Sequence, residues 1–383
     1  MPKQSAQDIV VLIPGYQPRK RMEPYIEQLI GAGIARIVVV DDGSGPDYDD
    51  IFGGLEPYPE VKVLRYEKNR GKGHALRHGM EYIAKEFPDC RFVITADIDG
   101  QHTVKDILRV ADALRQDSTG ILLGSRDFAA SHVPSKSRMG NRITSKVFQG
   151  LYGRKISDTQ TGLRGFSGAM IPRFLSVKGD RYEYEMNQLI YCSIENIPIR
   201  SLPIETVYED NNVDSHFRAF ADSWRIYRII LARFVHFALS SMFCFLVDYG
   251  IFLLTNDLLR TYVPALDQSL SILFIHFVAR IGIAATVARI VSATLNYIIN
   301  KRMVFKSSAA IVKSFLRYAV TVVLIIALSS GIVSSLYTEL GWSENLTKIP
   351  VDLLLFFLSY YIQRKWVFGS GSHMEAQAEK RNG

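Results

Sequence analysis

The chain has 383 residues, which exceeds one ordinary domain and predicts two or three structural units. It carries a net charge of +7, 22% charged residues and only three cysteines, with ordinary glycine and proline contents. These values exclude a collagen, a disordered chain and a disulfide-stabilised scaffold, and they leave nucleic acid or an anionic membrane surface as partners for the positive charge.

Residues 9–233 alternate short β-rich runs with helical stretches. The runs are IVVLIP, RIVVVDD, VKVLRY and RFVITADID, with helices expected over 22–32 and 75–87. This alternation predicts an α/β fold whose mostly parallel sheet has helices on both faces. Such sheets bind ligands beyond the carboxyl ends of the strands, where polar clusters follow three runs, at 14–16, 41–44 and 97–101. Because GxGxxG and Walker lysine motifs are absent, we expect a nucleotide crevice of another kind.

The cluster after the fourth run has the composition of a metal site. Asp97, Asp99 and Gln101 offer only hard oxygen ligands, which suit Mg²⁺ or Mn²⁺ and leave positions open for a diphosphate. A D-x-D pair on its own also occurs in ordinary turns. The expectation of a metal-bridged diphosphate therefore depends on the motifs around it.

Six motifs occur in a characteristic order: IPGY, VVVDDGSG, NRGKGHALRHG, TADIDGQH, LLGSR and DTQTGLRGF. In this order they resemble the family 2 glycosyltransferases of the GT-A fold, over about residues 8–230. The resemblance is strongest to the branch that makes dolichyl- or polyprenyl-phosphate hexoses. It implies an inverting transfer of a hexose from a nucleotide sugar to a lipid phosphate.

The resemblance also implies roles for individual residues. Those implied at the nucleotide are Pro14, Tyr16, Asp41, Asp42, Lys72 and Asp97, and those at a Mg²⁺ or Mn²⁺ ion are Asp97, Asp99 and Gln101. Those implied in catalysis are Asp97, Asp99, Arg126 and Arg138, and those at the acceptor phosphate are Arg126, Ser137, Arg138, Asn141 and His216. The alternatives are a plain turn at 42–45, a solvated Lys72 and surface ion pairs for the two arginines. Gln17-Pro18 and His216 depart from the pattern of the mannose-transferring relatives.

A lipid phosphate acceptor reduces what the site must do. Its second ionisation lies near pH 6, so most of it is a dianion at neutral pH and needs no general base. The metal and the arginines then have to bring two anions together. Direct displacement at the anomeric carbon inverts its configuration, as the resemblance implies.

An amphipathic helix is predicted over 216–233, directly before the first hydrophobic span. Its aromatic and apolar stripe consists of Phe217, Phe220, Trp224, Tyr227 and Leu231, with arginines on the other faces. A basic, aromatic helix in this place is typical of a membrane interface, and packing against the soluble domain is the alternative.

Four hydrophobic spans follow, at about 234–255, 280–300, 319–337 and 346–363. The apolar residues 270–279 either extend the second span or lie re-entrant. Basic residues gather after the second and fourth spans, so the positive-inside rule places the soluble domain and both termini in the cytoplasm. Four charged residues inside the spans either contact lipid phosphate or pair within the bundle: Asp248, Arg280, Arg289 and Asp352.

Two of the span ends resemble each other, since NYIINKRMVF begins at residue 296 and SYYIQRKWVF at residue 359. The match indicates two helical hairpins derived from one unit, although span ends in general collect basic and aromatic anchors. The repeat resembles the GtrA-like membrane family over about residues 234–368. That family accompanies lipid-linked sugar transfer, which favours UDP-glucose as the donor.

These features predict four segments: a cytoplasmic GT-A domain over 1–215, an interfacial helix over 216–233, a four-helix membrane domain over 234–368 and a flexible tail over 369–383. The expected function is metal-dependent hexose transfer from a nucleotide sugar to polyprenyl phosphate at the bilayer surface. The alternatives are GDP-mannose donation and a lipid-sugar translocator with a nucleotide-sugar binding module. Nucleic acid is not an expected partner, because the basic residues cluster at the membrane edges, and a homo-oligomer stays open.

Overall fold

The computed structural model describes residues 7–18, 22–128, 135–205, 219–267, 269–272, 275–305, 307, 309–340 and 344–369, with the backbone alone at 135–137, 219–223 and several positions between 267 and 348. The chain divides into two compact units, Met1–Ile230 and Leu231–Gly383.

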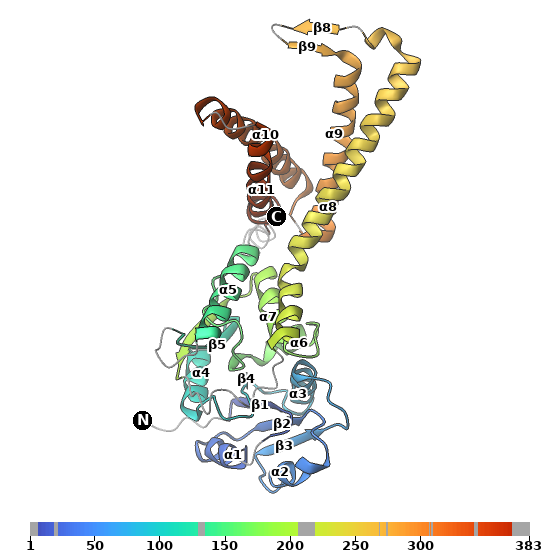
Figure 1. Cartoon of the computed structure of the whole chain (residues 1–383). Coiled ribbons are helices and arrows are strands. Elements are labelled where there is room, and N and C mark those ends of the chain that lie inside the picture. Colours follow the sequence, from blue (N-terminus) through green and yellow to red (C-terminus); the bar gives the residue numbers. More distant parts are fainter. Residues whose placement is uncertain are drawn as a thin grey trace, which may run out of the picture. The chain divides into compact units, whose positions relative to one another are not determined.

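The first unit is built on a sheet with the strand order β3-β2-β1-β4-β6-β5-β7 (Figure 1). Its strands are β1 (Ile9–Gly15), β2 (Ile37–Asp41), β3 (Val61–Arg65), β4 (Phe92–Thr95), β5 (Ile121–Arg126), β6 (Arg164–Ser167) and β7 (Ile199–Ile204). Only β6 runs antiparallel to its neighbours, β4 and β5. The mostly parallel sheet predicted from the alternating pattern is therefore confirmed.

Helices pack against both faces of this sheet. They are α1 (Met22–Gly31), α2 (Asp49–Gly53), α3 (Lys72–Glu86), α4 (Val104–Gln116), α5 (Ser135–Tyr152), α6 (Ile171–Leu175) and α7 (Glu183–Ile194). Alternate residues of β1 enter different cores: Val10 and Leu12 pack with α3, α5, α6 and α7, whereas Val11 and Ile13 pack with α1, α2 and α4. Because both faces are covered, the central strands are apolar throughout, and their polar residues lie at the strand ends.

Helix α8 (Ala219–Tyr262) is continuous from the described part of the predicted interfacial segment through the predicted first span. Its Ile226 and Ile230 are buried in the core of the first unit. Trp224 on the predicted stripe is 69% exposed, while the Tyr227 hydroxyl lies 3.1 Å from the Thr144 hydroxyl of α5. The helix therefore packs within the first unit through Tyr227 of the predicted stripe and through Ile226 and Ile230, which the stripe did not include.

The second unit is helical, with α9 (Ala279–Ile299), α10 (Ile311–Leu340) and α11 (Glu344–Ile362) following α8. Among the described residues, three helical segments are long and apolar enough to cross a bilayer: Trp224–Tyr262, Ala279–Val304 and Ile311–Ser329. The fourth predicted span, at 346–363, stays a prediction. The apolar residues before Ala279 do not extend the second span as a helix where the structure describes them, since β8 (Ser269–Ile272) and β9 (Ile275–Val278) pair as antiparallel strands and α9 begins at Ala279.

The sequence repeat of this unit is also a structural repeat. Both repeated segments pass into a π-helix, at Asn300–Val304 and at Gln363–Val367. Asn300 Nδ2 donates to Gln363 Oε1 at 3.0 Å, and Phe305 stacks on Phe368 with ring centroids 5.1 Å apart. Equivalent residues of the two hairpins therefore meet each other.

The charged residues within the spans have polar partners in the same unit. Ser292 Oγ donates to Asp248 Oδ1 at 2.7 Å, and Arg289 Nη2 lies 3.5 Å from Asp248 Oδ2. Ser329 Oγ donates to Asp352 Oδ1 at 2.6 Å, and Arg280 donates to the Asn256 side chain. These contacts are the intrabundle pairing that was one of the two sequence-based alternatives.

Candidate active site

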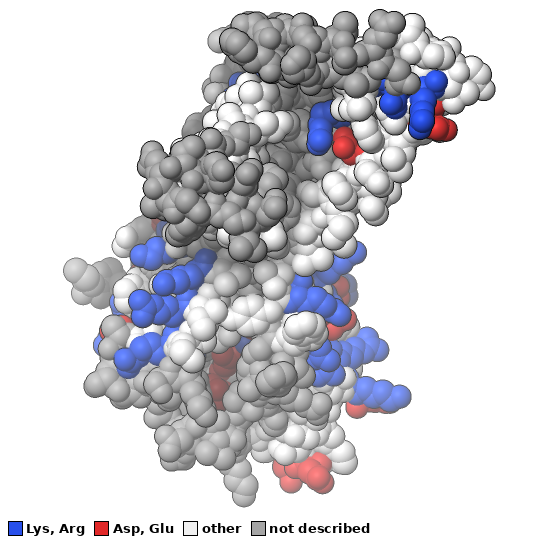
Figure 2. All heavy atoms as spheres, turned by 45° about the horizontal axis from the view of Figure 1, so that its top comes forward, with Lys and Arg blue, Asp and Glu red and all other residues white. Residues whose placement is uncertain are grey.

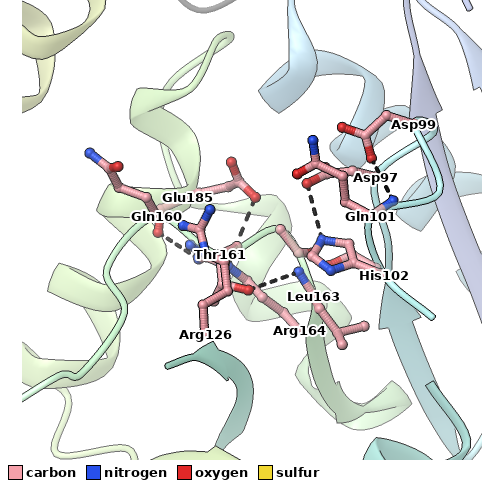
Figure 3. Close-up of polar contacts among 12 residues, drawn as sticks. Asp97, Asp99, Gln101, His102, Arg126, Gln160, Thr161, Leu163, Arg164 and Glu185 are labelled. Carbon is pink, nitrogen blue, oxygen red and sulfur yellow. Dashed lines mark hydrogen bonds and ion pairs between the residues drawn. The ribbon is translucent and has the colours of Figure 1, made fainter. Parts of the chain in front are cut away.

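The acidic loop that follows β4 brings together the three expected metal ligands. β4 lies between β1 and β6 near the middle of the sheet, and its carboxyl end leads directly into Asp97, Asp99 and Gln101 (Figure 3). The Gln101 amide N–H donates to Asp99 Oδ1 at 3.0 Å, which folds the loop back on itself. The loop is anchored from outside by the Tyr25 hydroxyl, which donates to the His102 carbonyl at 2.8 Å.

Lys72 links this loop to helix α7. It is the first residue of α3, and its Nζ lies 2.7 Å from Asp97 Oδ1 and 3.0 Å from Glu185 Oε1. Burial lowers the pKa of Lys72, but the Asp97 and Glu185 carboxylates outweigh burial and raise the pKa above its ordinary value. Lys72 is therefore a charged member of the site and not a solvated surface lysine.

The two aspartates of the loop differ in their electrostatics. Burial raises the pKa of Asp97, yet Lys72 and His102, whose Nε2 lies 3.1 Å from Asp97 Oδ2, hold the pKa well below its usual value. Burial and the neighbouring Asp97 carboxylate raise the pKa of Asp99. Two carboxylates held this close repel each other, and a cation between them relieves that repulsion.

Gly162 makes room for the Asp97 side chain. A methyl group at this position would lie 2.5 Å from Asp97 Oδ1, closer than van der Waals contact allows. The carbonyl of Gly162 accepts a hydrogen bond from Thr95 Oγ1 at 2.7 Å, which ties the segment to the end of β4. The first glycine of the DTQTGLRGF motif is thus required by packing against the acidic loop.

The donor set of the loop fits Mg²⁺ or Mn²⁺, since two carboxylates and an amide oxygen are hard ligands that leave positions for water and phosphate. Among the described residues, no group of three or more His, Cys, Asp or Glu side chains is placed to hold a metal ion.

The residues expected at the nucleobase lie at the adjoining ends of β1 and β2. Pro14 and Gly15 pair in register with Val40 and Asp41, and Tyr16 follows, partly buried. Asp41 Oδ1 accepts one hydrogen bond, from the Ser44 amide at 2.9 Å. The structure therefore brings Pro14, Tyr16 and Asp41 together at one edge of the sheet.

Asp42 makes a different set of contacts from its neighbour Asp41. It is 3% exposed, and its carboxylate accepts hydrogen bonds from the Tyr66 hydroxyl, the Asn69 side chain and the backbone amides of Arg70 and Gly71, at 2.7–3.1 Å. These bonds fix the loop that leads into Lys72. The side chain of Asp42 thus holds this loop, and its nucleotide-binding role stays a prediction.

Two residues expected at the acceptor phosphate hold the segment that contains Asp158. Arg126 makes a bidentate ion pair with the buried Asp158, with Nε at 2.7 Å and Nη2 at 3.1 Å. The Asn141 amide donates to the Ser157 carbonyl at 2.6 Å, and its oxygen accepts from Thr159. These contacts connect β5, α5 and the DTQTGLRGF segment.

Arg138 is exposed on α5, and Figure 2 shows Lys and Arg side chains as prominent on the visible face of the first unit. The Ser137 side chain and all of His216 lie outside the described residues.

The structure adds Glu185, Arg164, His102 and Asp158 to the site. Three of them stand within the motifs TADIDGQH and DTQTGLRGF, which were the available signal. Glu185 lies in none of the six motifs, and only the fold brings it to Lys72.

Residues 10–178 match the family model described as glycosyl transferase family 2, and residues 236–368 match the GtrA/DPMS transmembrane domain. The chain is 27% identical over 230 residues to an uncharacterised protein of Methanocaldococcus jannaschii, covering 59% of this chain and 92% of that one. It is 26% identical over 245 residues to the UDP-N-acetylglucosamine–dolichyl-phosphate N-acetylglucosaminyltransferase of Methanococcus voltae, covering 59% and 96%. The human dolichyl-phosphate β-glucosyltransferase is 25% identical over 223 residues, which cover 51% and 65% of the two chains. Among solved structures, glucosyl-3-phosphoglycerate synthase of Mycobacterium tuberculosis aligns with a TM-score of 0.45 at 14% identity, covering 58% of this chain and 78% of that one.

Proposed function

We propose that this chain, in which a glycosyl transferase family 2 domain is followed by a GtrA/DPMS transmembrane domain, transfers a hexose from a nucleotide sugar to polyprenyl phosphate. The names of two relatives support a dolichyl-phosphate type of acceptor. UDP-glucose is the favoured donor, in keeping with the relatives named as β-glucosyltransferases. The reaction belongs at the cytoplasmic face, because the basic span ends are expected there.

The observation that carries the proposal is the Asp97–Asp99–Gln101 loop at the carboxyl end of β4, with Lys72 beside it. Such strand ends are where open α/β sheets bind their ligands. A Mg²⁺ or Mn²⁺ ion held by these three residues would stabilise the departing nucleoside diphosphate as a Lewis acid. Pro14, Tyr16 and Asp41 would flank the nucleobase at the neighbouring strand ends.

The remaining residues are proposed to orient the acceptor. Arg138, together with Ser137 and His216, would bind the lipid phosphate, while Arg126 and Asn141 would support them by fixing the Asp158 segment. The phosphate oxygen attacks the anomeric carbon, and the bond from that carbon to the diphosphate oxygen breaks. Since the acceptor is already a dianion at neutral pH, no side chain has to remove a proton.

The test is product formation by the purified full-length protein with Mn²⁺, a short-chain polyprenyl phosphate and UDP-glucose, UDP-N-acetylglucosamine or GDP-mannose. We expect lipid-linked glucose, and Asp99→Ala should reduce its formation about 100-fold or more. The exposed Asp50→Ala is the matched control and should stay active.

Transfer from GDP-mannose alone would replace the proposed donor. If no donor gives a product, and vesicles containing the protein transport a lipid-linked sugar, the chain is a translocator and the proposed transferase activity is wrong.

A further inference from the structure

Glu185 is a buried carboxylate that the proposed reaction leaves without a role. It lies in the first turn of α7, its side chain is 7% exposed, and its Oε1 is 3.0 Å from Lys72 Nζ. Arg164 holds it from behind, with Nη1 donating to the Glu185 carbonyl at 2.7 Å and Nε 3.9 Å from Oε1 (Figure 3). Lys72 thus lies between two carboxylates, Asp97 in the acidic loop and Glu185 on α7, and a function for Glu185 is to be sought in its contact with Lys72.

Lys72 lies in a cluster of two basic side chains and three carboxylates. Lys72 and Arg164 are positive, and Asp97 and Glu185 are negative, with Asp99 as a further carboxylate. A divalent cation bound by Asp97 and Asp99 would compete with the Lys72 ammonium, which lies 2.7 Å from Asp97 Oδ1. Two positive charges on one carboxylate oxygen repel each other, so the lysine would have to give up that oxygen.

We propose that Glu185 is a positioning residue that retains the Lys72 ammonium when a divalent cation takes over Asp97. The inference rests on the proposed function, because it assumes a cation at the acidic loop. Since Lys72 already touches both carboxylates, it gives up one partner and keeps the other. The cation gains access to Asp97, and the ammonium stays beside the loop, where a diphosphate would need a second positive charge.

The test is Mn²⁺ binding by the full-length protein in detergent, with free Mn²⁺ measured by electron paramagnetic resonance. Glu185→Gln should raise the dissociation constant, because Lys72 then has Asp97 as its only carboxylate partner. Removing a negative charge also weakens cation binding directly, by the same factor whether or not Lys72 is present. The proposal therefore requires that Glu185→Gln raise the Mn²⁺ dissociation constant by a factor about tenfold larger when Lys72 is present than in the Lys72→Met background.

A second variant separates position from charge. Glu185→Asp keeps the charge but draws the carboxylate back from Lys72 by one methylene. It should weaken Mn²⁺ binding severalfold when Lys72 is present and leave it unchanged in Lys72→Met. Glu183→Gln is the matched control, because Glu183 lies in the same first turn of α7 as Glu185. The Glu183 carboxylate accepts hydrogen bonds from the Asp180 and Arg181 amides, and its substitution should show no coupling to Lys72.

The outcomes distinguish this proposal from the proposed function. If the Glu185 variants change Mn²⁺ binding by equal factors in both backgrounds, or not at all, the positioning role is overturned while the transferase assignment stands. If the unaltered protein binds no Mn²⁺, the metal assignment itself is overturned, and the role of Glu185 with it.

Discussion

Asp41 and Asp42 are adjacent in sequence, yet the structure predicts opposite results when each is changed to asparagine. Asp42 is buried and accepts hydrogen bonds from two side chains and two backbone amides of the loop 66–71. In Asp42→Asn one carboxylate oxygen becomes an NH₂ group, so that a buried donor faces another donor. An unsatisfied buried donor costs about 1–3 kcal/mol, and losing the charge weakens the remaining bonds by about 1 kcal/mol. The expected loss of unfolding free energy is therefore about 3 kcal/mol.

For a unit of this size, that loss corresponds to a thermal midpoint about 6–12 °C lower. The assay is thermal unfolding of the full-length protein, followed by intrinsic fluorescence. Asp41→Asn is the control, because Asp41 accepts one hydrogen bond, from the Ser44 amide, and an asparagine oxygen can replace that acceptor. Its midpoint should fall by no more than about 3 °C, while its Michaelis constant for the nucleotide sugar should rise. Equal loss of stability in the two variants would refute the assignment of Asp42 to the loop.

Three further predictions concern the acidic loop, the acceptor and the membrane unit. Gly162→Ala should displace Asp97, cost about 1–3 kcal/mol of stability and remove Mn²⁺ binding; unaltered binding with an unaltered thermal midpoint would contradict the packing argument. Arg138→Ala should raise the Michaelis constant for polyprenyl phosphate severalfold and leave that for the nucleotide sugar unchanged; a rise for the donor instead would move Arg138 to the other substrate. Asn300→Leu removes the Nδ2 donor from the buried Gln363 Oε1 and should destabilise the membrane unit by about 1 kcal/mol, measured by unfolding in mixed micelles; an increase in stability would show that the buried pair is dispensable.

The sequence predicts the parts of the fold that have a regular hydrophobic pattern. The runs that became β1 to β4 are bounded by polar clusters, and the alternation of strands and helices indicates the parallel sheet. β6 carries no such pattern, because its four residues RGFS become a strand only by pairing with β4 and β5. The hairpin of β8 and β9 was missed for a related reason, since a short apolar run is equally compatible with a helix.

For the site, too, the sequence predicts contacts between residues of one motif and not contacts between distant parts of the chain. Asp97, Asp99 and Gln101 are close in sequence, so their proximity could be predicted from one motif. Lys72 contacts both Asp97 and Glu185, which lie far from it and from each other in the sequence, and no spacing rule connects the three residues. Asp41 and Asp42 cannot be distinguished from the sequence. Only the hydrogen bonds of the folded chain show that Asp42 anchors the loop 66–71, whereas Asp41 accepts a bond from the Ser44 amide and stays a candidate for binding the nucleotide.

The meeting of Asn300 with Gln363, and of Phe305 with Phe368, has a consequence for how the membrane unit can change over time. On the twofold axis of a dimer of identical subunits, a residue contacts the same residue of the other subunit, and the two halves of this unit meet in the same way. Here the two halves belong to one chain, so the two positions need not carry the same residue, and asparagine stands in one half where glutamine stands in the other. The two halves also differ in what precedes them, since only the first directly follows the glycosyl transferase family 2 domain.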